Sequence, residues 1–139
     1  MKKLLVTIIV LALASVTFWY STTLENDAAG EITIILIDDQ GEEVLNDVYQ
    51  FEAEDTLFEI LNENYQVGCA NATYDLSSEC TESLTGRVIL QIEDVVTDWD
   101  NTFIAIYIND EYSQFGVDSI SLHDQDVIKF EYTEVGDAE

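Results

Sequence analysis

The sequence predicts an α+β domain in which one short helix packs on a mixed sheet of about five strands. Five segments have the apolar, β-branched or alternating composition of strands, and one segment between them has apolar residues at helical spacing. The chain contains no proline that would interrupt these strands. Its 139 residues suffice for one domain with a short extension.

The first two strands are predicted at residues 31–38 and 48–53. Almost every residue from Ile32 to Ile37 is apolar or β-branched, which indicates a central strand with both faces covered. An acidic turn containing Gly41 follows at 38–43. We therefore expect the two strands to form a hairpin-like pair.

The helix is predicted at residues 56–65, with Asp55 as its N-cap. Its apolar residues at helical spacing are Leu57, Phe58, Leu61 and Tyr65. Glu59, Asn62 and Glu63 fall on the opposite side, so the helix should bury one face.

The second half of the chain is predicted to contain one long loop and three strands. Residues 68–85 are rich in Ser, Thr, Asn and Gly, which favours a loop, and the strands follow at 87–94, 102–109 and 127–133. The order strand, strand, helix and three further strands is typical of the β-grasp, or ubiquitin-like, roll.

The charge of the chain excludes one class of partner. The sequence has 29 Asp and Glu residues against 4 Lys and Arg residues, a formal net charge of −25. Nucleic acids and anionic lipids bind through Lys and Arg, so nucleic acid is not an expected partner. The 47% hydrophobic and 11% aromatic content argues for an ordered core in spite of the charge.

The N-terminal segment, residues 1–20, is an export signal or signal anchor. Lys2 and Lys3 precede a charge-free run at 4–20. Cleavage after Ala14 and retention as a membrane anchor both fit, because the run of 17 uncharged residues reaches the lower limit for a spanning helix of about 17 to 25. Residues 21–29 form a linker, 30–135 the domain and 136–139 a tail, and the domain is expected outside the cytoplasm, anchored or secreted.

The last forty residues carry a family resemblance. The strand 103–109, the step Gly116-Val117 and the segment 122–132 resemble the transcobalamin-like β-grasp family, in which an Asn-Gly turn, a Gly-Val or Gly-Ala step and an Asp-Gly-Asp turn precede a final apolar strand. The helix start at 55–61 is similar as well. Asp110 and Gln125 stand where the family usually has glycine.

This resemblance implies an exported or surface-anchored domain without a catalytic motif. The animal relatives form one half of a vitamin B12 site, so a cobalamin ligand is implied by analogy only. The residues themselves indicate no cofactor, no metal and no enzyme activity.

Cys69 and Cys80 are predicted to form a disulfide, because paired cysteines in a small exported domain meet an oxidising compartment. His123 is the sole histidine and is interpreted as a solvent-facing turn residue. No catalytic residue is assigned.

The carboxylates are interpreted as a solvated surface. Asp98-Trp99-Asp100-Asn101 is the segment nearest to a calcium loop, but it lacks the full set of 6 to 8 oxygen ligands.

The candidate ligand-binding residues are Trp99, Tyr107, Tyr112 and Phe115, which gather around the fourth strand and the loop after it. Trp and Tyr are favoured at recognition sites, although most aromatic residues serve as core. We expect an exported, non-catalytic ligand-binding or adaptor domain at the outer face of a bacterial membrane, with a cobalamin-like or other flat molecule as the candidate ligand. The alternatives are a protein–protein module of a surface or transporter complex and a calcium-dependent surface domain.

Overall fold

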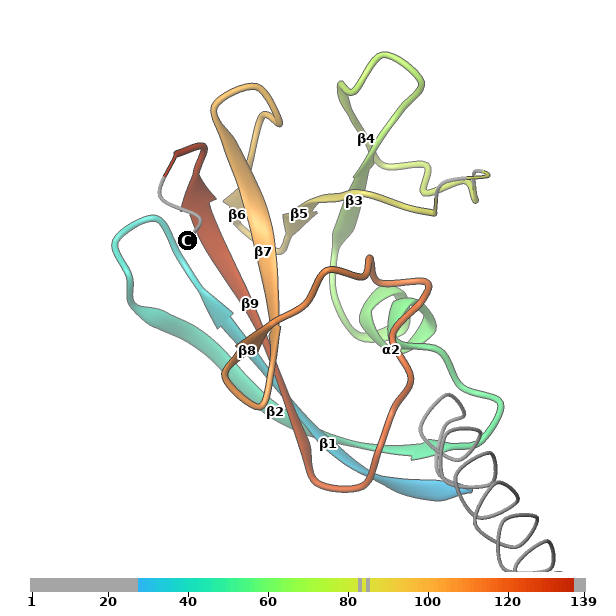
Figure 1. Ribbon diagram of the computed structural model, residues 1–139. Coiled ribbons are helices and arrows are strands. Elements are labelled where there is room, and N and C mark those ends of the chain that lie inside the picture. Colours follow the sequence, from blue (N-terminus) through green and yellow to red (C-terminus); the bar gives the residue numbers. More distant parts are fainter. Residues whose placement is uncertain (1–27, 83, 85, 137–139) are drawn as a thin grey trace, which may run out of the picture.

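Two β-sheets and one helix make up the part of the chain that the computed structural model describes, which is residues 28–82, 84 and 86–136 (Figure 1). The predicted α+β class is confirmed. The predicted layout of a single sheet of about five strands is incomplete, because the described residues form one five-stranded and one four-stranded sheet.

The larger sheet has the strand order β2-β1-β9-β7-β8. Its members are β1 (Ala29–Ile37), β2 (Glu43–Glu52), β7 (Thr102–Ile108), β8 (Glu111–Tyr112) and β9 (Asp126–Glu134). β1 pairs antiparallel with β2, as the predicted hairpin requires, and parallel with β9. The sheet is therefore mixed, and the last strand of the chain lies beside the first.

The smaller sheet is antiparallel and has the order β4-β3-β5-β6. It contains β3 (Val67–Ala70), β4 (Leu76–Ser77), β5 (Ile89–Ile92) and β6 (Val95–Val96). The prediction of one loop over 68–85 was wrong in part, since β3 and β4 lie inside it or at its edge. These strands are too short to show a period of two. In addition, β3 pairs with β5, which is distant in the sequence, so that Val67 lies opposite Ile92.

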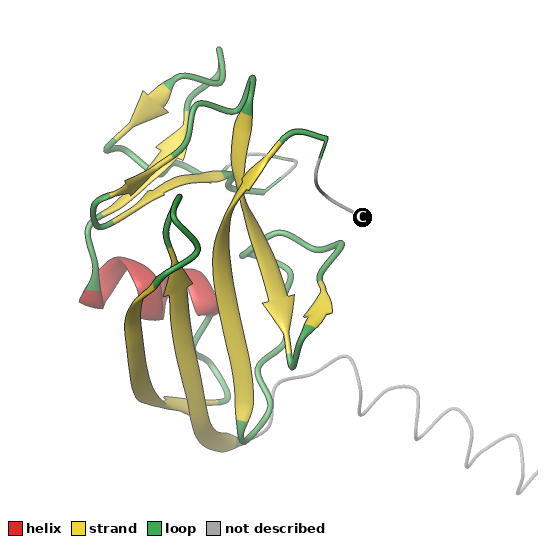
Figure 2. Ribbon diagram, turned by 90° about the vertical axis from the view of Figure 1, so that its left-hand side faces the viewer, coloured by secondary structure: helices red, strands yellow, loops and turns green. Residues whose placement is uncertain are grey.

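The core lies between the larger sheet, the helix α2 (Leu57–Asn64) and the smaller sheet. Figure 2 shows α2 against one face of the long strands. The buried face of α2 consists of Leu57, Phe58, Ile60 and Leu61, which join Ile32, Ile34, Leu36, Ile128 and Phe130 in one cluster. The amphipathic pattern of the sequence thus decided which side of the helix is buried.

Thr56, not the predicted Asp55, caps the helix. The Thr56 hydroxyl accepts a hydrogen bond from the Glu59 backbone N–H, and the Glu59 carboxylate accepts one from the Thr56 backbone N–H at 3.0 Å, which makes a capping box. Asp55 accepts instead from the Glu52 N–H at 2.8 Å, in the turn before the helix.

β1 is central in the sheet, as predicted, but only one of its faces is fully buried. Ile32, Ile34 and Leu36 are buried, while Thr33, Ile35 and Ile37 on the opposite face are intermediate. The unbroken apolar run suggested two covered faces, and the described part of the chain places its helix and second sheet on one side.

The two positions where glycine was expected adopt left-handed backbone conformations. Asn109 and Asp110 have φ of 52° and 68° in the turn between β7 and β8, and Gln125 has φ of 70° before β9. Two consecutive left-handed residues are the signature of the two-residue hairpin turn that Asn-Gly favours. The non-glycine residues thus keep the turn shapes at a conformational cost.

No helix within the described ranges has the length and apolar character needed to cross a membrane. The predicted export or anchor segment at 1–20 and most of the linker lie outside the described residues.

Candidate functional site

Every exposed aromatic side chain of the described residues lies in one region of the surface. These side chains are Tyr74, Trp99, Tyr112 and Phe115, with exposed fractions of 53, 39, 53 and 66%. We call them the aromatic patch. Large aromatic side chains are usually buried or placed at recognition surfaces, so their exposure together makes this region the candidate site.

Tyr74, in the turn between β3 and β4, stacks on Trp99, in the turn before β7. Their ring centres are 5.4 Å apart and the ring planes differ by 14°. Both residues have a left-handed backbone, with φ of 61° and 65°. Bulky residues rarely adopt this conformation, and such strain is found mainly at functional sites.

Trp99 also lines a pocket of about 210 Å³ together with Tyr112 and Phe115. Ile104, Ala105 and Val117 contribute buried apolar surface to the same pocket. The structure therefore brings together three of the four residues predicted from the sequence.

A larger and more open groove of about 890 Å³ adjoins this pocket and shares the segment 112–115 with it. His123 and Asp126 also line this groove. A ligand held at the aromatic pocket could extend along this groove.

The fourth predicted residue, Tyr107, lies behind the patch. Its half-buried ring packs edge to face with the Tyr112 ring, with 5.7 Å between the ring centres. The Lys129 Nζ lies 4.5 Å from the centre of the Tyr107 ring. Tyr107 can support the position of Tyr112, while its ring is already engaged by Lys129.

Sequence reasoning missed Tyr74. It lies in the turn between β3 and β4, far from Trp99 along the chain, and only the tertiary structure brings the two rings together. The available signal was its place as an aromatic residue in a polar loop between two cysteines.

Three contacts hold the loops that carry the patch. The predicted disulfide between Cys69 and Cys80 is present, with 5.2 Å between the Cα atoms, and it closes the loop that contains Tyr74. Asp118, in the loop after β8, pairs with the Arg87 guanidinium and also accepts from the Arg87 N–H at 2.6 Å. The Arg87 Nε donates to the Cys80 carbonyl at 3.1 Å, which joins both loops.

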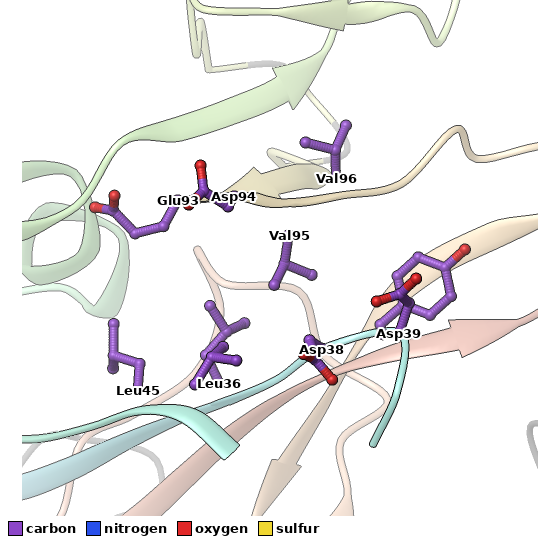
Figure 3. A pocket seen from close by; sticks show the side chains of 10 residues that line it. Leu36, Asp38, Asp39, Leu45, Glu93, Asp94, Val95 and Val96 are labelled. Atoms are coloured by element: carbon purple, nitrogen blue, oxygen red, sulfur yellow. The ribbon is translucent and has the colours of Figure 1, made fainter. Parts of the chain in front are cut away.

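A second pocket of about 470 Å³ opens between the two sheets (Figure 3). Its walls are apolar at Leu36, Leu45 and Val95, and its rim carries Asp38, Asp39, Glu93 and Asp94. Two of these carboxylates already accept backbone hydrogen bonds, Asp38 from Gln40 and Glu42, and Glu93 from Gln66.

The Asp98 segment is not arranged as a calcium loop. One Asp98 carboxylate oxygen accepts from the Asn101 and Thr102 N–H groups and the other from the Asn101 side chain. These bonds, with the Asn101 side chain as the largest cause, lower the pKa of Asp98 to about 2. Asp98 therefore closes its own turn, next to Trp99.

Within the described ranges, no group of three or more His, Cys, Asp or Glu side chains is arranged to hold a metal ion. The His123 Nδ1 lies 3.4 Å from the buried Asp126 carboxylate, which also accepts from the Asn109 side chain at 2.8 Å. This cluster joins the turn after β7 to the start of β9.

Comparison with known proteins supports the fold. No curated protein sequence matches the chain. A crystal structure of a protein from Ruminococcus gnavus ATCC 29149, named as a proposed metal-binding protein, is similar with a TM-score of 0.54 and 20% identity. The match covers 76% of this chain and 97% of that one. At this identity the likeness concerns the fold alone.

A family model described as "Domain of unknown function (DUF4430)" matches residues 54–134, from the turn before α2 to the end of β9. The matched region contains all four residues of the aromatic patch and both cysteines. The chain belongs to this family.

Proposed function

We propose that the protein is an exported, non-catalytic ligand-binding domain that holds a flat ligand on the aromatic patch at the outer face of a bacterial membrane. The observation that carries this proposal is that three of the four exposed aromatic side chains of the described residues line one pocket, and the fourth, Tyr74, stacks on one of them. Stacking on rings favours flat ligands, and concave apolar pockets are the usual small-molecule sites.

We further propose that the larger sheet is a β-grasp of the transcobalamin-like kind. The antiparallel pair β1–β2, the helix after it and the parallel placement of β9 beside β1 support this assignment. The left-handed Asp110 and Gln125 support it too, because they occupy the turn positions at which glycine is usual in that family. Cobalamin is then a candidate ligand, by analogy with the animal members of that family.

The sequence supports the proposed location. Lys2 and Lys3 before the apolar run at 4–20 favour export of the rest of the chain. The disulfide is compatible with an oxidising compartment.

The test is a set of thermal melts of the full chain in a mild detergent. The panel contains cobalamin, haem, CaCl₂ and NaCl at matched ionic strength. A ligand at 100 times its Kd stabilises the folded chain by about 2.7 kcal/mol, which raises the Tm of a domain of about this size by about 10 °C.

The proposal requires that a flat molecule raises the Tm and that Phe115→Ala removes the rise. Val48→Thr is the matched control, because Val48 is an exposed apolar residue on β2 outside the patch. A rise with CaCl₂ beyond that with NaCl would favour the calcium-dependent alternative. If no small molecule changes the Tm, the result would contradict the proposal and favour the alternative of a protein–protein interaction module.

A further inference from the structure

We propose that the aromatic patch selects small organic cations with a quaternary ammonium head over anionic ligands. This inference rests on the proposed function in that both place a ligand on the aromatic patch, but it names a compact cationic head group, and not a flat molecule, as the preferred ligand of that site. It follows from the charges around the patch, from what the fold does with its own cations, and from the size of the pocket.

Carboxylates stand next to three of the four aromatic patch residues in the sequence. Asp75 follows Tyr74, Asp98 and Asp100 stand on either side of Trp99, and Glu111 precedes Tyr112. All four acidic side chains are exposed. The low pKa of Asp98 keeps its charge down to strongly acidic pH. An anionic ligand would meet repulsion here, whereas a cation would be attracted.

Positive charge near the patch is already neutralised. Arg87 and Lys129 are the only Lys or Arg residues within the described ranges. Arg87 lines the aromatic pocket but pairs with Asp118, and Lys129 lies 3.2 Å from the Glu131 carboxylate. Neither cation is left to attract an anionic group to the patch.

The fold places both of these cations on aromatic rings. The Arg87 guanidinium carbon lies 4.0 Å from the centre of the Phe58 ring, and the Lys129 Nζ lies 4.5 Å from the centre of the Tyr107 ring. Both distances are within the range of a cation–π contact. The exposed rings of Trp99, Tyr112 and Phe115 offer the same chemistry, with Trp the strongest of the three kinds of ring.

The pocket size favours a head group over a whole ligand. Its volume of about 210 Å³ is below the roughly 300 to 1,000 Å³ of sites that enclose a drug-sized molecule. A trimethylammonium group would occupy the aromatic pocket, and the rest of the molecule would extend along the open groove past the segment 112–115.

The test is isothermal titration calorimetry of the full chain with choline and with 3,3-dimethylbutanol, its uncharged isostere. We expect choline to bind and the isostere to bind about tenfold more weakly, since the two differ only in charge. Phe115→Ala and Trp99→Ala should each weaken choline binding at least about threefold, the lower range of a cation–π contact. Val48→Thr should leave it unchanged, and circular dichroism checks that every variant is folded.

Three results would overturn the inference. The first is equal binding of choline and its isostere. The second is choline binding that Phe115→Ala and Trp99→Ala leave intact, which would indicate counterion binding to the acidic surface. The third is binding of an oligo-arginine peptide without binding of choline, which would point to a protein partner.

The panel also separates this inference from the proposed function. If haem or cobalamin binds in a manner that depends on Phe115 and choline does not bind, the flat-ligand function stands and the cation preference is wrong. If neither the flat ligands nor choline binds, both are wrong.

Discussion

Removal of the disulfide should lower the free energy of unfolding by about the amount that closure of its loop contributes. The change is the double substitution of Cys69 and Cys80 by alanine, which avoids placing a hydroxyl at the buried Cys69. The two cysteines are 11 positions apart. For a loop of this length the chain-entropy relation gives about 2.8 kcal/mol at 25 °C.

The expected loss corresponds to a fall in Tm of about 11 °C, because 1 kcal/mol shifts the Tm of a domain near 100 residues by about 4 °C. Urea unfolding of the full chain, followed by circular dichroism, measures the free energy of unfolding directly. Wild-type protein with intact cysteines and the two single substitutions are the comparisons.

A loss below about 1 kcal/mol would refute the loop-closure reasoning, since it would mean that the 69–80 segment is already restricted in the unfolded chain. The same variant reports on the aromatic patch. In a Trp19→Phe background Trp99 is the only tryptophan of the chain. Because the disulfide closes the loop that holds Tyr74 on Trp99, its removal should change the Trp99 fluorescence.

Three further predictions concern single residues. Thr56→Ala should lower the free energy of unfolding by about 1 kcal/mol through loss of the helix cap. Urea unfolding measures the change, with Thr56→Ser as the control that keeps the hydroxyl. An unchanged free energy of unfolding in Thr56→Ala would contradict the capping box. Gln125→Gly should raise the free energy of unfolding by about 0.5 to 1 kcal/mol, because glycine relieves the left-handed strain at φ 70°; a lower stability in the same assay would speak against strain there. Asp98 has a lower pKa when folded, about 2 against 3.8, so its stabilisation is complete above about pH 4 and is lost as the pH falls toward 2. Asp98→Asn should therefore lose less stability than wild type between pH 5 and pH 2 in urea titrations, and parallel losses would disprove this role.

The secondary structure that depends on local pattern could be read from the sequence. The β-branched run at Ile32 to Ile37 formed a central strand, and the spacing of the apolar residues Leu57, Phe58 and Leu61 formed the helix with that face inward. The choice of cap could not be read, because Asp55 and Thr56 are both good caps. The extended backbone of Thr56 and the hydrogen bond from Glu52 to Asp55 decided it.

The smaller sheet was beyond sequence reasoning for a different reason. β3 and β4 contain only four and two residues, which is too short for an alternating pattern to stand out from a polar, glycine-containing loop. Their pairing depends on β5, which is distant in sequence, so only the packed chain stabilises them.

For the candidate site, the sequence by itself determined the residue types and most of the positions. The order of residues alone predicts an aromatic cluster around the fourth predicted strand and an acidic surface. It also predicts the disulfide, because paired cysteines in an exported domain meet an oxidising compartment. The tertiary structure decided which rings are exposed, because exposure depends on what packs above each side chain. It placed Tyr107 behind the patch and brought Tyr74 onto Trp99, since stacking needs rings about 5 Å apart, and only the folded chain brings the turn after β3 and the turn before β7 to that distance.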